Sequence, residues 1–159
     1  MPHDHAHFMR AAMQEAAKGL ADGNIAVGSV VVRRDEIVGR GRNLIGLTRN
    51  PTDDAETIAM SDAARTLGQP DLAGCTLYTT VECCPMCCGA AMVSGISTLV
   101  IGMRFKPDEF STQRFGDYSV ERLIELAGWD DRLQVVTGIL SEECLALRRE
   151  WEALRKTRS

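Results

Sequence analysis

The amino-acid sequence predicts an α/β fold, a three-layer α/β/α sandwich with a mixed five-stranded sheet. Stretches with apolar residues at every third or fourth position alternate with short β-rich runs, after an opening pair of such runs. Strands that alternate with helices favour parallel pairing, and the opening pair suits an antiparallel hairpin. The 159 residues show no repeat, linker or low-complexity tract. We therefore expect one domain over residues 1–159.

The helices are predicted from the helical spacing of apolar residues. The helix that follows Pro51 has Thr52 or Asp53 as its candidate N-cap. The next helix begins at Cys84 and accepts Pro85 in its first turn, where no backbone N–H is needed. The five expected helices span residues 7–20, 54–67, 84–93, 120–126 and 139–156.

The strands are predicted from runs rich in β-branched and apolar residues. The residues Arg33, Arg34 and Asp35 separate the first two runs and suit a short hairpin turn. The third run leads directly into Cys84. The five expected strands span residues 27–32, 36–44, 75–81, 97–103 and 133–137.

The composition is that of an ordinary globular protein, with 45% hydrophobic and 25% charged residues. No apolar run is long enough to span a bilayer, so no membrane partner is expected. A net charge of −4 argues against a nucleic-acid partner and favours a small-molecule substrate. The first residues lack the basic and apolar regions of a secretion signal, which indicates a cytoplasmic protein.

Cysteine usage points to a metal rather than to disulfides. Four of the six cysteines crowd together at Cys83, Cys84, Cys87 and Cys88. Clustered thiols without a secretion signal are typical of metal ligands in a reducing compartment. The C-x-x-C pair Cys84 and Cys87 brings two sulfurs to one side of a helical turn, where they can bind one ion.

A second stretch supplies carboxylates for the same site. Asp54 and Glu56 lie in the first turn of the helix after Pro51. A carboxylate beside a metal, but not bound to it, can move a proton from a water that the metal acidifies. Either Asp54 completes the metal site or a residue of the N-terminus does, where the only histidines, His3, His5 and His7, are found. A structural zinc site, with Cys83 or Cys88 as fourth ligand, or a redox pair is the alternative.

Five motifs along the chain carry a family resemblance. A carboxylate two residues after a ligand, followed by C-x-x-C, is the signature of zinc-dependent base deaminases. The chain resembles the cytidine deaminase-like superfamily, and within it the group of cytosine deaminase, guanine deaminase and bacterial tRNA adenosine deaminase. The matching motifs are residues 39–43, 50–56, 74–80, 84–90 and 138–144.

The resemblance implies a role for each site residue. Cys84 and Cys87 bind Zn²⁺, Asp54 stands where the family has a histidine ligand, and Glu56 shuttles protons as the catalytic residue. Asn43 matches the asparagine that holds the substrate ring. A homodimer is expected by resemblance only. Candidate stacking or lid residues of the substrate pocket are Phe115 and Trp151, together with Phe110 and Tyr118.

Two departures from the family pattern affect the chemistry. Cys83 replaces a proline and is interpreted as a small buried residue. Asp54 makes the zinc site one charge more negative than a histidine would, so the metal should be a weaker Lewis acid. A family member that has lost activity is therefore an alternative, although Glu56 is retained.

The favoured function is hydrolytic deamination of a free nucleobase or related amino-heterocycle, with cytosine first and guanine next. The alternative is a tRNA adenosine deaminase or a catalytically weak RNA-binding partner subunit. Basic residues near the C-terminus could contact a phosphate backbone. A solvated helix end explains them as well and is preferred. These residues are Arg148, Arg149, Arg155, Lys156 and Arg158.

Overall fold

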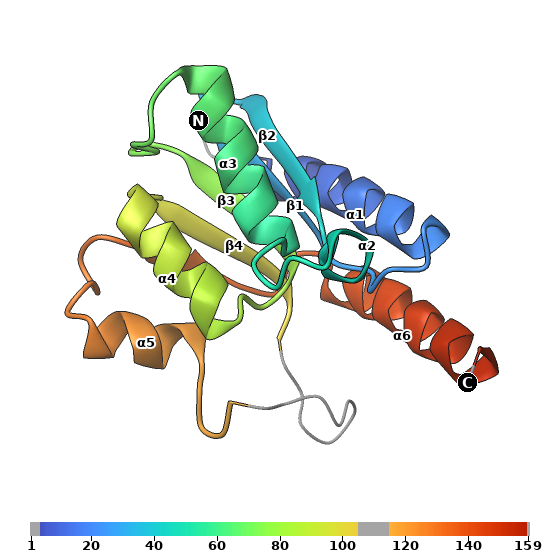
Figure 1. Ribbon diagram of the computed structural model, residues 1–159. Helices are drawn as coiled ribbons and strands as arrows, with labels where there is room; N and C mark the ends of the chain where they lie inside the picture. The colour runs from blue at the N-terminus through green and yellow to red at the C-terminus, as the bar shows by residue number, and fades with distance from the viewer. Residues whose placement is uncertain (1–3, 105–114, 159) are drawn as a thin grey trace.

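The computed structural model describes residues 4–104 and 115–158 (Figure 1). The elements of this part of the chain follow one another as helices that alternate with strands after an opening β-hairpin. In order they are α1 (His5–Ala21), β1 (Gly28–Arg33), β2 (Glu36–Arg42), α2 (Ile45–Thr48), α3 (Ala55–Leu67), β3 (Thr76–Val81), α4 (Pro85–Ser94), β4 (Thr98–Met103), α5 (Val120–Leu126), β5 (Gln134–Val136) and α6 (Ser141–Thr157).

The expected mixed five-stranded sheet is confirmed. Its strand order is β2-β1-β3-β4-β5. The pairs β1–β2 and β1–β3 are antiparallel, whereas β3–β4 and β4–β5 are parallel. Each parallel pair is joined through a helix, α4 or α5, as such pairs require.

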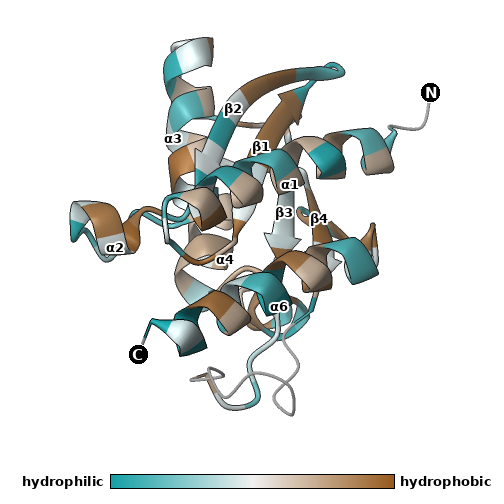
Figure 2. Ribbon diagram, turned by 90° about the vertical axis from the view of Figure 1, so that its right-hand side faces the viewer, coloured by the Kyte–Doolittle hydropathy of each residue, from teal (hydrophilic) through white to brown (hydrophobic). Residues whose placement is uncertain are grey.

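Helices cover both faces of the sheet, which gives the three layers predicted from the sequence. The helices α3 and α4 lie on one face, and α1 and α6 lie together on the other (Figure 1). In Figure 2 the view is turned so that α1 and α6 lie in front of the strands, and both carry hydrophilic and hydrophobic bands. Such two-sided helices bury the apolar side against the sheet.

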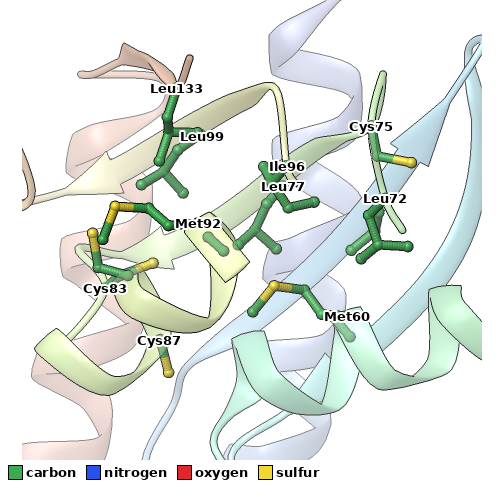
Figure 3. Packing of buried hydrophobic residues seen from close by; sticks show 14 of the residues in the cluster. Met60, Leu72, Cys75, Leu77, Cys83, Cys87, Met92, Ile96, Leu99 and Leu133 are labelled. Atoms are coloured by element: carbon green, nitrogen blue, oxygen red, sulfur yellow. The ribbon is translucent and has the colours of Figure 1, made fainter. Parts of the chain in front are cut away.

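Alternate residues of the central strands feed two separate cores. One row crosses β1, β3 and β4 at Val31, Leu77 and Leu99, and these side chains pack with α3 and α4 (Figure 3). The row one residue away, which includes Tyr78, packs with α1 and α6. Cys87 from the first turn of α4 belongs to the first core. The stretch that carries the predicted thiol ligands therefore packs on a buried apolar core.

Glycines of β2 allow α3 to approach the sheet closely. A Cβ atom on Gly41 would lie 2.3 Å from the carbonyl oxygen of Ala55, and one on Gly39 would lie 2.3 Å from that of Ala59. Real Cβ atoms do not come so close to backbone atoms. The glycines thus set the position of the first turn of α3, which carries Glu56.

The structure differs from the sequence prediction in two places beside the site. The run from residue 43 does not continue β2 but turns into the short helix α2. The N-cap of α3 is Asp54 rather than Thr52 or Asp53. The predicted hairpin turn is present: Arg33 ends β1, and the turn uses Arg34 and Asp35, both with positive φ although neither is a glycine or an asparagine.

Candidate active site and metal centre

Three potential metal ligands meet where two helices begin. Asp54 precedes α3 and Cys84 precedes α4, and Cys87 lies in the first turn of α4. The Asp54 Oδ2 atom lies 3.5 Å from the Cys87 sulfur and 3.8 Å from the Cys84 sulfur. Among residues 4–104 and 115–158, these are the three residues whose ligand atoms all fall within 4.8 Å of one another. The arrangement has the size of a single-ion site.

The thiol pair is set up by the start of α4. Cys84 has extended backbone angles and Pro85 follows at the first helical position, so the chain turns sharply from β3 into the helix. The pKa of Cys84 is lowered to about 7, mainly by a hydrogen bond from the Cys87 thiol. The backbone N–H groups of Cys87 and Met86 lower it further. The same thiol contact and burial raise the pKa of Cys87. Cys84 is therefore the more easily ionised of the two thiols.

The Asp54 carboxylate uses its two oxygens differently. Oδ1 accepts hydrogen bonds from the backbone N–H of Ala55 at 2.8 Å and from Nδ2 of Asn43 at 3.1 Å. Oδ2 faces the two sulfurs. The Asp54 backbone N–H donates a hydrogen bond to the Thr57 hydroxyl oxygen at 3.1 Å. The cap of α3 thus orients one free carboxylate oxygen toward Cys84 and Cys87.

Glu56 is a buried carboxyl group beside this cluster, with only 2% of its surface exposed. Its Oε1 accepts a hydrogen bond from the Thr79 hydroxyl at 3.0 Å. Its Oε2 is buried with no hydrogen-bond partner among the described residues. Burial, and then the nearby Asp54 carboxylate, raise the pKa of Glu56 well above its ordinary value. A carboxyl group in this state suits a proton shuttle.

These residues fit a zinc ion. Two thiolates and a carboxylate are donors that zinc accepts, and three protein ligands leave the fourth position open, as in catalytic sites. A divalent cation would offset the negative charge that Asp54, the thiols and Glu56 concentrate in one place. Glu56 Oε2 is buried and has no hydrogen-bond partner among the described residues, so it is available to hydrogen-bond a group that binds beside the ion.

The N-terminal alternative for the third ligand is not supported by the described residues. The His5 side chain lies in α1 and its Nδ1 is 2.9 Å from the Tyr78 hydroxyl, on the α1 side of the sheet. His7 is exposed beside Phe8. His3 lies outside the residues that the structure describes.

The neighbouring cysteines are buried outside the cluster. Cys83 and Cys88 are fully buried in the apolar core with α3 and α4. The Tyr118 hydroxyl donates to the Cys83 carbonyl oxygen at 2.6 Å, so Tyr118 supports the start of α4 instead of lining the pocket. A closed site with Cys83 or Cys88 as fourth ligand is not what this geometry favours.

A cavity of about 580 Å³ opens onto the cluster. It is large enough for a nucleotide-sized ligand. The predicted pocket residues Asn43, Phe115 and Trp151 line it together with Asp54, Glu56 and Cys84. Phe110, the remaining stacking candidate, lies outside the described residues.

Two residues of the site escaped the sequence analysis. Thr79 lies within a buried strand, and the period-two pattern gives its face but not its contact with Glu56. Arg148 was interpreted as part of a solvated helix end, which is wrong because it is only 5% exposed and lines the cavity. Its guanidinium lies 3.2 Å from Glu152 and over the Trp151 ring. The helical period of α6, which places residues 144 and 148 on one face, was the available signal.

The fold and site define a metal-dependent deaminase. Residues 2–103 match the family model for the cytidine and deoxycytidylate deaminase zinc-binding region. Since this match covers more than half of the chain, the protein belongs to that family, and its cofactor is zinc. Deaminases of this family are hydrolases that act on carbon–nitrogen bonds.

Similar proteins point to a particular branch of the family. The chain is 31% identical to the tRNA-specific adenosine deaminase of Bacillus subtilis over 96% of both chains. It is 36% identical to that of Haemophilus influenzae over 86% of this chain and 76% of the relative.

Solved structures of both a tRNA deaminase and a guanine deaminase share the fold. A structure from a study of A-to-I editing by tRNA:A34 deaminases has a TM-score of 0.76 at 26% identity, over 89% of this chain and 98% of that one. The guanine deaminase of Nitrosomonas europaea has a TM-score of 0.78 at 29% identity, over 93% and 84% of the chains.

These relatives correct two expectations from the sequence. Deamination of a free base, cytosine first, was wrong, because the curated relatives at 31% and 36% identity are named for tRNA. The expectation of a small molecule and no nucleic acid was wrong for the same reason. The net charge of −4 is a sum over the whole chain. It does not report the local positive charge that a phosphate backbone meets. The homodimer stays a prediction.

The expectation that no segment spans a bilayer can be compared with the helices of the structure. None of the helices within the described ranges is long and apolar enough to cross a bilayer.

Proposed function

We propose that this protein deaminates adenosine in transfer RNA, with inosine and ammonia as products. The observation that carries the proposal is the near full-length similarity to a tRNA-specific adenosine deaminase. The site supports it because a buried carboxyl group, three residues that could hold a metal ion and an adjoining cavity lie together.

Each site residue then has a task in the reaction. Asp54, Cys84 and Cys87 hold zinc, which when bound supplies an acidified water for attack on C6 of adenine. Glu56 would take one proton of that water and give it to the ring nitrogen as the hydroxyl group adds to C6. It would then take the proton of the added hydroxyl group and give it to the amine, which leaves as ammonia while the C6 carbonyl forms. Its burial beside Asp54 keeps its proton affinity high enough for both deliveries.

The helix α6 contributes Arg148 and Trp151 to the lining of the cavity. Trp151 offers a ring on which a base can stack, and Phe115 a second one. Arg148 and Arg155 lie over the Trp151 ring at 5.4 and 5.1 Å from its centroid. Exposed basic residues follow along the helix and favour a phosphate backbone; they are Arg149, Arg155, Lys156 and Arg158.

The test is inosine formation in tRNA. Purified protein is incubated with an unmodified tRNA that carries adenosine at the wobble position, and inosine is detected by sequencing as an A-to-G change. The matched control is Glu56→Gln, which keeps the shape of the side chain but cannot accept the proton. We expect inosine with the wild type and at least a ~100-fold lower rate with the variant. Ammonia release from cytosine or guanine, without inosine in tRNA, would contradict the proposal.

One observation favours a second candidate, an RNA-binding subunit with little activity. Asp54 replaces the histidine ligand of the family and makes the metal a weaker Lewis acid. Under this alternative the protein binds tRNA with a steep salt dependence, yet no inosine forms even at equimolar enzyme.

A further inference from the structure

Asn43 is held in one orientation at the end of β2. It is 8% exposed. Its Oδ1 accepts from the backbone N–H of Ile45 at 3.1 Å, and its Nδ2 donates to Asp54 Oδ1 at 3.1 Å. Its own backbone N–H donates to the Val27 carbonyl oxygen at 3.2 Å. Reversing the side-chain amide would set its oxygen against the Asp54 carboxylate, so the network determines which end of the amide faces Asp54.

The contact with Asn43 makes the two oxygens of Asp54 inequivalent. Oδ1 receives two N–H donors, from Asn43 and Ala55. Oδ2 receives neither and lies nearest to the sulfurs of Cys84 and Cys87. Without these donors a carboxylate can rotate about χ2 and exchange its oxygens. With them, one oxygen is held away from the cluster and the other is presented to it.

We propose that Asn43 is a positioning residue for the metal ligand Asp54, holding the carboxylate so that Oδ2 alone binds the ion. Partners that orient a ligand in this way strengthen metal binding by about 10–100-fold. The inference concerns the zinc site proposed above and does not depend on which substrate is deaminated.

The contact is specific to a carboxylate ligand. A histidine that binds zinc through one ring nitrogen carries a hydrogen on the other, and that N–H is a donor. Two donors cannot bond to each other, so Nδ2 of Asn43 has nothing to orient when residue 54 is histidine. Asn43 and Asp54 are therefore expected to be energetically coupled in metal binding, and a histidine should remove the coupling.

The test is a double-mutant cycle in zinc affinity, measured without substrate. Zinc dissociation constants are determined by competition with a chromophoric chelator for the wild type, Asn43→Ala, Asp54→His and the double variant. We expect Asn43→Ala to weaken zinc binding about 10–100-fold in the wild-type background. In the Asp54→His background the same change should alter affinity less than about threefold, because the acceptor is gone.

Two controls separate positioning from folding. Thermal unfolding of the metal-free proteins shows whether the variants remain folded. If Asn43→Ala does not fold, Asn43→Ser replaces it, because the smaller serine side chain still has an oxygen that can accept from the Ile45 N–H. Absorption spectra of the cobalt-loaded proteins report the ligand geometry directly. An equal loss of zinc affinity in both backgrounds, or none in the wild-type background, would overturn the proposal. Since no step involves tRNA, this outcome is independent of whether inosine forms.

Discussion

The hydroxyl group of Thr79 lies 3.0 Å from Oε1 of Glu56, in the interior of the protein. The same hydroxyl is 2.9 Å from the Val81 carbonyl oxygen, so Thr79 can turn between two acceptors. A donor at Oε1 disfavours a proton there. The proton that Glu56 carries is therefore directed to Oε2, the oxygen that has no partner in the described part of the chain.

This contact predicts the effect of Thr79→Val, which removes the hydroxyl while conserving the side-chain volume. A hydrogen bond to a charged group contributes about 1.5–3 kcal/mol, which corresponds to a roughly 10- to 100-fold lower kcat. KM should stay unchanged because the hydroxyl is 0% exposed and does not touch the substrate. Steady-state kinetics with tRNA measure kcat and KM separately. Thr79→Ser should recover most of kcat, and a fall in kcat that serine does not rescue would count against the role.

The cysteines give a prediction with internal controls. Replacing Cys84 or Cys87 by serine should abolish stoichiometric zinc, because an alcohol is a much poorer ligand than a thiolate. Cys88→Ala alters the same helix at a fully buried position outside the ligand cluster and should leave zinc at one per chain. Metal analysis after purification without chelators makes the comparison. Zinc loss in Cys88→Ala but not in Cys87→Ser would place the metal elsewhere.

The close approach of α3 to the sheet predicts the effect of Gly41→Ala. The added methyl meets backbone atoms of α3 at 2.3 Å, so α3 has to shift, at a cost of about 1–3 kcal/mol. The matched control is Gly89→Ala in α4, whose Cβ has nothing within 4 Å. Because alanine is the better helix former, this change should stabilise the protein by about 0.5–1 kcal/mol. Urea unfolding compares both variants with the wild type, and equal stabilities for all three would contradict the packing described.

The ion pair between Arg104 and Glu121 predicts a pH dependence. Hydrogen bonds from Arg104 lower the pKa of Glu121. A carboxyl group whose pKa is lower in the folded protein adds stability above its unfolded pKa of about 4.3, and the gain is lost as pH falls through the folded pKa. Glu121→Gln should therefore cost stability at pH 6, and this cost should shrink progressively as the pH falls below about 4.3. Because Glu121 is half exposed, the difference should stay below about 1 kcal/mol.

The sequence predicted the elements well where the pattern is long and regular. The boundaries of α5 were predicted to the residue, and the order of the strands and longer helices was correct. The short helix α2 was missed because four residues do not complete a periodic pattern. Asp54 was not recognised as the N-cap, since Thr52 and Asp53 have equally good capping side chains. Only the tertiary contacts with Asn43 and the thiols distinguish it.

The site could be predicted where its residues lie close together in the sequence. The spacing of Cys84 and Cys87, and the offset of Asp54 and Glu56, predicted the cluster because each pair lies within one helical turn. Thr79 and Arg148 reach the site from a buried strand and a distant helix. The helical period of α6 indicates that Arg148 is buried, but no spacing rule connects either residue with Glu56 or the cavity. The substrate could not be inferred from net charge, because recognition depends on where the charges lie.

The most direct measurement of the central claim is zinc content and inosine formation for Asp54→Asn beside the wild type. Asparagine keeps the shape of the side chain and an oxygen that can cap α3, but it lacks the charge that binds the metal. We predict that the wild type carries one zinc per chain and forms inosine in tRNA, whereas the folded variant loses both. A variant that retains full zinc and full activity would contradict Asp54 as a ligand and the site built around it.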